Sequence, residues 1–421
     1  MQLIKIRRDA GYLILWIMAV IYPLVVVPYQ FCVSFPSINQ FFLSCFYAPR
    51  YILLAVLAGM ALVVLVKDRA QVKHPVFIPL GLFMFFAFLS ALLAPEPATA
   101  WIGSPFRYTG YTTYLFCSIL FTLACRSSYA EQLLRYTVYT AVLVSFIALL
   151  QYLGLNPVPH EPYRDGFRSY STLGNPDFLG SYLVFIWPAA VFFYLRDKEI
   201  RWLISSAVIY LGLVLSQTRS AWIAFFITFI CIFFYTLRTP ERKKPITLLA
   251  VTLLVVSCLF SFIQGGTIFP NKDGSIAREV AAALRFEDDA GNGRVLIWKE
   301  TVRLLPAHWA FGVGPDHLGY AGLIAKQQYP IDKAHNMFLE IAVTMGVFAL
   351  LSYLAFLSFF IPLYRSEPGF MFFAMILAYL SQGLCNIEVI MVMPLFWIVL
   401  GLSLGCTAGR EGNNQGNGSC V

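Results

Sequence analysis

The sequence predicts an all-α polytopic membrane protein with about twelve transmembrane helices. Hydrophobic residues fill 59% of the 421 positions and charged residues only 12%, whereas a soluble domain is about 45–50% apolar and about 25% charged. The apolar residues form continuous stretches of roughly 20 residues, the length that a helix needs to cross a bilayer. This composition excludes a soluble globule, a disordered chain and a fibrous repeat. The continuous stretches also exclude a transmembrane barrel, whose strands alternate apolar and polar residues.

The first span follows a short basic segment that contains Lys5, Arg7 and Arg8. Its apolar run is longer than the roughly 7–15 residues of a signal peptide and has no small-residue cleavage site, so we expect it to be retained. Eleven further ranges have a similar apolar character. The predicted spans are 10–33, 50–67, 75–94, 110–125, 132–153, 176–195, 201–216, 220–237, 246–264, 335–363, 368–385 and 388–406.

The basic residues predict the orientation of these spans. With the N-terminus inside, the inner segments hold 17 of the 30 lysines and arginines, and the short outer loops hold five. The other eight lie in the long segment 265–334, which the positive-inside rule does not count. The distribution predicts an even number of spans with both termini cytoplasmic. Because the positive charge is spread over short loops, the net charge of +8 does not indicate nucleic-acid binding.

Four regions follow from this assignment. Residues 1–264 hold spans one to nine, 265–334 form a large extracytoplasmic loop, 335–406 hold the last three spans, and 407–421 form a Gly/Asn-rich tail that we expect to be disordered in the cytoplasm. The loop contains two amphipathic patterns, at 275–286 and 294–305, which predict helices on the membrane surface covering a cavity. Glycines at 291–293 and 312–314 predict a turn and a break.

All five basic residues in the short outer loops are arginines. Arginine is always charged and binds phosphate or carboxylate with a planar fork, so this bias indicates an anionic partner. Chance, or contact with lipid headgroups, is the alternative explanation. The five residues are Arg50, Arg107, Arg164, Arg168 and Arg219.

Two arginines lie at predicted helix starts. Arg219 opens span eight, and Arg294 opens the second loop helix. The free N–H groups of a helix N-terminus together with a guanidinium are typical of an anion site. A snorkelling arginine at the membrane interface or a solvated surface arginine is the alternative for each.

Only one of the five histidines, His335, lies where a polar loop enters an apolar helix. A histidine at such a boundary can act as a general base near neutral pH, although a lone histidine is more often structural. Two further stretches place polar groups at the outer ends of spans: Gly-Ser-Pro-Phe-Arg-Tyr at 103–108 and Gly-Asn-Pro-Asp at 174–177.

Several motifs are missing from the sequence. It contains no P-loop, no G-x-G-x-x-G and no G-x-S-x-G. The outer face has no D-x-D, only a loose acidic cluster at 287–289. A metal-dependent glycosyltransferase needs paired carboxylates for a cation on the diphosphate. We therefore expect arginine, rather than a metal, to stabilise any leaving diphosphate, and we expect no cofactor. The nine cysteines show no metal-site or redox spacing.

Together these motifs resemble the O-antigen ligase and O-antigen polymerase family of bacterial inner-membrane glycosyltransferases. The resemblance covers roughly 170–360, and each motif alone is weak. It is carried by Gly-Asn-Pro at 174–176, Thr-Arg-Ser-Ala at 218–221, Gly-Arg at 293–294 with Trp298, Gly-Val-Gly at 312–314, and Asp-Lys-Ala-His-Asn at 332–336 with Leu339 and Gly346.

The resemblance implies a GT-C-like membrane fold with about twelve spans. It also implies a polyprenyl-diphosphate-linked glycan as donor, used at the extracytoplasmic face of the plasma membrane without a metal. The family's two essential arginines fall on Arg219 and Arg294, which would hold the leaving diphosphate, and its essential histidine falls on His335, which would take the proton of the acceptor hydroxyl. Direct attack would invert the anomeric centre.

Further residues are expected to bind substrate. Arg107 and Asn175 would bind phosphate or sugar, and Asn336 and Glu340 would orient His335 or bind a sugar hydroxyl. Lys333 is also expected to bind substrate. The acceptor stays open between a lipid, a glycan and a protein side chain, and so does the choice between ligase and polymerase.

Two other functions have to be weighed. A transporter or flippase for lipid-linked glycans would place charged sites near the midplane and often has repeated halves, neither of which the sequence contains. A non-catalytic glycan-binding protein would not need the arginines and the histidine. The enzymatic hypothesis requires Arg219, Arg294 and His335 to converge at the outer end of a membrane-embedded cleft.

Overall fold

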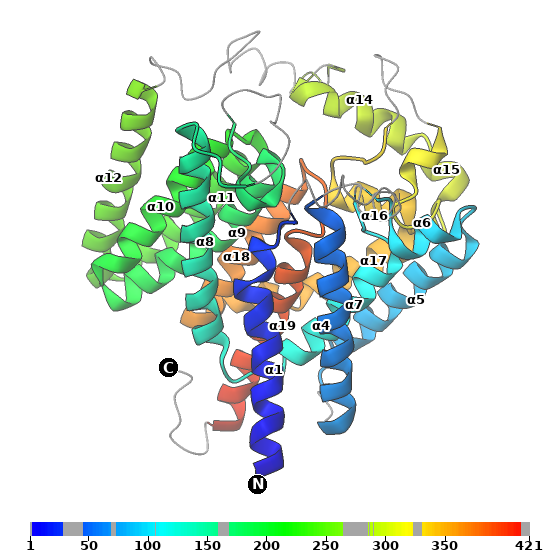
Figure 1. Cartoon of the computed structure of the whole chain (residues 1–421), viewed down its shortest axis with the longest axis horizontal. Coiled ribbons are helices and arrows are strands. Elements are labelled where there is room, and N and C mark those ends of the chain that lie inside the picture. Colours follow the sequence, from blue (N-terminus) through cyan, green and yellow to red (C-terminus); the bar gives the residue numbers. More distant parts are fainter. Residues whose placement is uncertain are drawn as a thin grey trace.

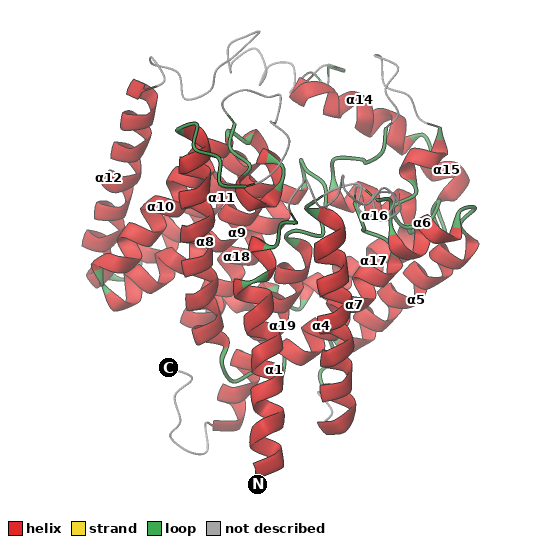
Figure 2. Ribbon diagram, viewed as in Figure 1, coloured by secondary structure: helices red, strands yellow, loops and turns green. Residues whose placement is uncertain are grey.

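The protein is all-helical throughout the part of the chain that the structure describes. The computed structural model describes residues 2–27, 45–68, 73–105, 107–158, 168–263, 285, 287–288, 290–322 and 331–413. Within these ranges all regular secondary structure is helical, as Figure 2 shows. The predicted fold class is therefore confirmed for the described residues.

Each of the twelve predicted spans contains a helix. The helices are α1 (Gln2–Val20), α4 (Tyr47–Asp68), α5 (Phe77–Leu93), α7 (Tyr111–Ala124), α8 (Ala130–Tyr152), α9 (Pro176–Asp197), α10 (Ile200–Ser216), α11 (Arg219–Leu237), α12 (Pro240–Ile263), α16 (Met337–Thr344) with α17 (Val347–Ser358), α18 (Glu367–Gly383) and α19 (Met393–Asn413). Shorter elements connect them: η1 (Tyr22–Leu24), α6 (Pro97–Ile102), η2 (Ser171–Leu173), α14 (Ala290–Val302), α15 (Leu305–His308), η3 (Leu318–Ala321) and η4 (Ile361–Arg365).

Six of the described helical segments are long and apolar enough to cross a membrane. They are Tyr47–Asp68, Ala130–Tyr152, Pro176–Asp197, Arg219–Leu237, Pro240–Ile263 and Val347–Arg365, and five shorter apolar helices accompany them. This is the composition of a multi-pass membrane protein. The count of twelve spans stays a prediction.

The helix α9 is the centre of the bundle. In its most apolar window 94% of the residues are buried, and it packs against α8, α10, α11 and α18. A helix that is apolar all round needs protein or lipid on every side. Outer helices instead expose large apolar side chains, such as Val66, Ile78 and Phe262, and such a surface suits lipid contact.

The ends of the bundle differ. In Figure 1 the start of α1 and the end of α19 lie at the lower end, whereas α14 and α15 lie at the upper end. Helix α14 also contacts α16. It begins at Ala290, four residues before the predicted start, and includes two glycines with positive φ, Gly291 and Gly293, so its first turn is irregular. The predicted helix 275–286 lies outside the described residues.

The predicted span 335–363 is not one helix. It breaks at Met345 and Gly346, between α16 and α17. Gly346 has φ +89°, and a Cβ there would overlap the Ala310 carbonyl. The chain at 309–314 fills the break: Gly314 N–H donates to Thr344 O at 2.8 Å, and Val347 N–H donates to Trp309 O at 2.7 Å. The Gly-Val-Gly stretch thus satisfies carbonyls at the end of α16 that have no partner within the helix.

Two other helix boundaries differ from the prediction. Helix α1 starts at Gln2 and ends at Val20, and a 3-10 turn containing Pro23 follows it. Helix α19 starts at Met393 and continues to Asn413, so it begins five residues later than predicted and extends beyond 406. Residues 385–392 are non-helical, yet most of them are buried. Apolar residues can be buried without being helical, so hydropathy could not detect this.

Arg50, predicted to lie in an outer loop, lies in the first turn of α4 and has a structural role. It is fully buried and donates hydrogen bonds to four backbone carbonyls, those of Tyr22, Pro23, Phe46 and Thr172. These bonds join the turn after α1 to the segment before α9. Arg164, another of the five outer arginines, lies outside the described residues.

Candidate active site

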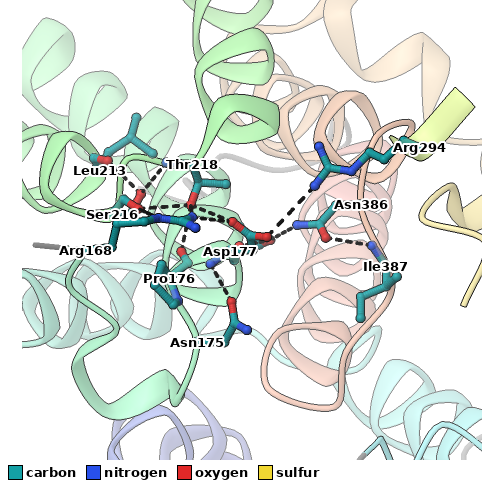
Figure 3. Close-up of polar contacts among 11 residues, drawn as sticks. Arg168, Asn175, Pro176, Asp177, Leu213, Ser216, Thr218, Arg294, Asn386 and Ile387 are labelled. Carbon is teal, nitrogen blue, oxygen red and sulfur yellow. Dashed lines mark hydrogen bonds and ion pairs between the residues drawn. The ribbon is translucent and has the colours of Figure 1, made fainter. Parts of the chain in front are cut away.

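The start of α9 places a carboxylate at the upper end of the bundle. Asn175 is the N-cap of α9, and its side-chain oxygen accepts a hydrogen bond from Asp177 N–H at 2.8 Å, drawn in Figure 3. Pro176 occupies the first helical position, where a missing N–H costs nothing. Asp177 is therefore fixed in the first turn, where the helix dipole favours a negative charge.

The Asp177 carboxylate joins three other segments of the chain. Arg168 Nη2 donates to Oδ1 at 2.6 Å, and the Thr218 hydroxyl lies 3.2 Å from the same oxygen. Arg294 Nη2, from α14, lies 3.9 Å from Oδ2. Figure 3 shows the two guanidinium groups approaching this carboxylate from different sides. Residues far apart in sequence thus share one charged cluster.

Arg219 is the first residue of α11, as the sequence predicts. Its neighbour Thr218 is the N-cap, and the Thr218 hydroxyl donates to Pro176 O at 2.9 Å. The close approach of α9 and α11 depends on Gly180, because a Cβ there would lie 2.8 Å from the Thr218 Cβ. This packing sets the backbone of Arg219 beside the Asp177 cluster.

His335 lies in the turn that enters α16, with a left-handed φ of +51°. Asn336 follows as the N-cap, its side-chain oxygen accepting from Phe338 N–H and Leu339 N–H. Burial and the positive charges of Arg294 and Arg107 lower the pKa of the His335 imidazole to about 4, against the opposing charges of Asp332 and Asp177. His335 is therefore neutral at pH 7. Its buried Nδ1 has no hydrogen-bond partner within the described chain.

The same charges show that His335 lies within electrostatic range of the Asp177 cluster. Coulombic interactions weaken with distance, and Arg294 and Asp177 both act on His335. Two of the three residues that the sequence predicts to converge, Arg294 and His335, are thus within electrostatic range of each other. The third residue, Arg219, is placed through its backbone, which follows the N-cap Thr218 at the start of α11.

Arg107 connects the segment before α7 to the His335 segment. Its Nη2 donates to Asp332 Oδ2 at 2.6 Å. Burial lowers the pKa of Arg107, but the charge and hydrogen bond of Asp332, together with smaller contributions from Tyr47 and Asp316, outweigh this effect, and the net shift is upward. Arg107 and Arg294 are thus the two described cations whose charge acts on His335.

Lys333 and Glu340, both predicted substrate ligands, form a buried ion cluster with Asp316. Lys333 Nζ lies 2.7 Å from Asp316 Oδ1 and 3.0 Å from Glu340 Oε1, and its side chain is only 4% exposed. Asp316 Oδ2 accepts from Ser104 N–H at 2.8 Å, and Glu340 Oε2 accepts from Ala334 N–H at 2.7 Å. The cluster fastens the Arg107 and His335 segments to each other. Direct contact of Lys333 or Glu340 with substrate stays a prediction.

Several residues at the site were not predicted as site residues from the sequence. Arg168 has a signal, because it is one of the five outer arginines, and Asp177 follows the Asn-Pro pair. Asp316 has none. Asn386, in the buried stretch before α19, donates to the Ser181 hydroxyl at 3.4 Å, and that hydroxyl donates to Asp177 O at 2.8 Å.

Of the acidic cluster at 287–289, the structure describes residues 287 and 288. Asp288 pairs with Lys299 of α14 at 2.9 Å. The described residues hold no group of three or more His, Cys, Asp or Glu side chains suited to a metal ion. Metal independence stays a prediction.

Comparison with known proteins identifies a domain. Residues 203–354 match the family model described as O-antigen ligase, a range that includes Arg219, Arg294 and His335. A search of curated proteins finds no match. The family match confirms the resemblance predicted from the sequence motifs. The chain therefore carries an O-antigen ligase family domain, which makes it a glycosyltransferase-like membrane enzyme.

Proposed function

We propose that the protein transfers an oligosaccharide or polysaccharide from a polyprenyl-diphosphate carrier to an acceptor hydroxyl at the extracytoplasmic face. The reaction inverts the anomeric centre and uses neither a metal nor a cofactor. One observation carries the proposal: Arg294 and Arg107 act electrostatically on His335 at the end of the bundle that bears α14 (Figure 1). This proximity supports the proposal that cations for a diphosphate and a base for a hydroxyl share one site.

The arginines stabilise the leaving group. When the bond between the anomeric carbon and the diphosphate oxygen breaks, both bonding electrons stay with the diphosphate. Arg219 and Arg294 hold this developing charge by charge-assisted hydrogen bonds. The 3.9 Å separation of Arg294 from Asp177 is longer than a hydrogen bond, so its N–H groups can still bind phosphate oxygens.

His335 acts on the acceptor. Its neutral imidazole accepts the proton of the acceptor hydroxyl as the hydroxyl oxygen attacks the anomeric carbon. The new glycosidic bond forms on the face opposite the leaving diphosphate, so the configuration inverts. The unpartnered Nδ1 of His335 supports this role, because the catalytic base needs a nitrogen that does not already hold another partner.

The other predicted residues complete the site. Arg107 binds phosphate, and Asn175 and Asn336 bind sugar hydroxyls through side-chain N–H₂ groups, since their oxygens cap α9 and α16. The charged atoms of Lys333 and Glu340 bond to each other. We therefore propose that these two residues position the His335 turn rather than contact the substrate.

The proposed setting is the bacterial plasma membrane, with twelve spans and both termini cytoplasmic. This orientation is supported by the start of α1 and the end of α19, which lie at the end opposite α14 (Figure 1). The donor then enters from the outer leaflet. A lipid, a glycan and a protein side chain all stay open as acceptors.

Released polyprenyl diphosphate tests the proposal. Purified protein is incubated with lipid-linked oligosaccharide and candidate acceptors, and we expect one polyprenyl diphosphate for each glycan transferred. A transporter or flippase would instead move the intact lipid-linked glycan across a vesicle membrane without releasing diphosphate, and that result would refute the enzymatic proposal.

Three variants test the residue roles. Arg219→Ala, Arg294→Ala and His335→Ala should each lower transfer by at least about 10²–10³-fold while the protein still inserts. The matched control is Arg201→Ala, which removes an exposed arginine paired with Glu199 and should leave the rate unchanged. Full activity in any of the three would remove that residue from the mechanism.

A further inference from the structure

Asp177 places a negative charge inside the arginine cluster that would receive the diphosphate. Its two carboxylate oxygens face Arg168 and Arg294. A fixed carboxylate beside an anion site opposes anion binding, since like charges repel. Its presence therefore needs an explanation that a simple phosphate cradle does not give.

The two arginines are held very differently. Arg168 donates to Asp177 at 2.6 Å, to Ser216 O at 3.1 Å and to Thr218 Oγ1 at 3.4 Å. Arg294 has only the 3.9 Å ion pair with Asp177 among the described residues, as Figure 3 shows. Arg168 therefore anchors the carboxylate, whereas Arg294 is only loosely paired with it.

Burial makes the loose pair unfavourable for Arg294. Its side chain is only 17% exposed, so water replaces little of the missing hydrogen bonding, and a poorly paired buried charge is costly. A diphosphate offers several charged oxygens to the same guanidinium. Exchange of the carboxylate for a phosphate would improve the pairing of Arg294 and leave Asp177 with Arg168 and Thr218.

We propose that Asp177 is a positioning residue that serves as an internal counter-anion: it neutralises Arg294 in the empty site, gives Arg294 up to the incoming diphosphate, and recovers it when polyprenyl diphosphate leaves. This inference rests on the proposed function, because it takes a diphosphate as the exchanging ligand. Asp177 competes with the ligand, so it weakens binding of donor and product alike and speeds product release.

Binding of inorganic pyrophosphate to the full chain in detergent, measured by calorimetry, tests this exchange. Asp177→Asn keeps the shape of the side chain and removes its charge, so pyrophosphate should bind about tenfold more tightly. Arg294→Ala should weaken binding, and Arg294→Ala combined with Asp177→Asn should lose most of the gain. A purely structural role for Asp177 predicts weaker binding in Asp177→Asn.

A second carboxylate provides a matched control. Glu131, at the cytoplasmic end of α8, also bridges two arginines, Arg135 and Arg196. Glu131→Gln therefore makes the same charge change in the same kind of pair. It should leave the pyrophosphate affinity unchanged. Equal tightening in Glu131→Gln and Asp177→Asn would mean that net charge alone is responsible, and would overturn the exchange.

Turnover gives an independent measurement. With lipid-linked donor, Asp177→Asn should lower KM and slow product release, so that a burst of transferred glycan precedes a slower steady state. Should Asp177→Asn fail to fold, Asp177→Ala takes its place with the same expected directions. Unchanged or weaker pyrophosphate binding in the folded variant overturns the proposal.

The two proposals fail separately. In one outcome, Asp177→Asn tightens pyrophosphate binding through Arg294 while no preparation releases polyprenyl diphosphate from a lipid-linked donor. That result would support the counter-anion role of Asp177 and refute the transferase function. If glycan transfer occurs and Asp177→Asn does not tighten pyrophosphate binding, the transferase function is supported and the counter-anion role of Asp177 is refuted.

Discussion

At the scale of single residues, the basicity of His335 depends on what its neighbours bind. Burial and the charges of Arg294 and Arg107 lower the pKa of the imidazole to about 4. This keeps the side chain neutral, but it also makes the side chain a weak base. A bound diphosphate would offset the positive charge of the arginines and raise the pKa again. The base would then strengthen only when the donor is in place.

The pH dependence of the rate tests this coupling. A falling pH protonates His335 and removes the base, so the rate declines as the pH drops through its pKa. The profile of kcat/KM reports the free enzyme and that of kcat the complex. We expect kcat/KM to decline near pH 4 and kcat to decline at a higher pH, measured with lipid-linked donor. Coincident declines would contradict the coupling.

Residue roles at this scale were only partly predictable. Arg219 stood out because arginine in a short outer loop departs from the positive-inside pattern. Arg294 stood out because it lies at a predicted helix start, and His335 because it lies at a polar–apolar boundary. Asp177 does not stand out from its sequence surroundings in this way, since an acidic residue in the first turn of a helix is ordinary. Its importance comes from the approach of Arg168 and Arg294, which local sequence does not encode.

At the scale of elements, the buried cluster of Lys333, Asp316 and Glu340 determines how the Arg107 and His335 segments meet. Lys333 lies two residues before His335, and Asp316 accepts hydrogen bonds from Ser104 N–H and Thr109 N–H on either side of Arg107. The attraction of the two carboxylates outweighs the burial of Lys333 and raises its pKa, so this charge persists at every pH of interest.

Removal of the central cation should be strongly destabilising. Lys333→Met leaves two buried carboxylates without their partner, which we expect to lower the free energy of unfolding by about 3–5 kcal/mol and to reduce transfer. Thermal unfolding of the purified protein measures the loss. Adding Glu340→Gln to Lys333→Met should recover part of the stability, because one of the unpaired charges is then removed.

The control is another lysine–aspartate pair. Lys299 of α14 bonds Asp288 at 2.9 Å, but this pair is partly exposed. Lys299→Met should therefore change stability by no more than about 1 kcal/mol. A comparable loss in the two lysine variants would argue against a special role for the buried cluster.

Element boundaries show why hydropathy predicts helices better than it predicts breaks. Every predicted span contains a helix because continuous apolar sequence in a membrane must satisfy its backbone internally. The break at Met345 and Gly346 is invisible in that pattern, since the residues around it remain apolar. It depends on the chain at 309–314, whose N–H groups reach the carbonyls of Val343 and Thr344.

At the scale of the whole molecule, the charged clusters divide between the two ends of the bundle. The end that bears α14 carries the Asp177 cluster, in which two arginines, Arg168 and Arg294, share one carboxylate. The other end has a balanced network in which Arg135 and Arg196 pair with Glu131 and Asp197. An anionic donor is attracted by an unbalanced positive site, and this supports the proposal that the reaction takes place at the α14 end.

Cysteine accessibility tests which side of the membrane that end faces. Arg303, just after α14, and Arg201, near the start of α10, are both more than half exposed. In intact cells a membrane-impermeant maleimide should label Arg303→Cys, whereas Arg201→Cys should require permeabilisation. The unsubstituted protein gives the background, because Cys258 is exposed. The opposite labelling pattern would place the α14 end in the cytoplasm, where a donor in the outer leaflet could not reach Arg294 and His335.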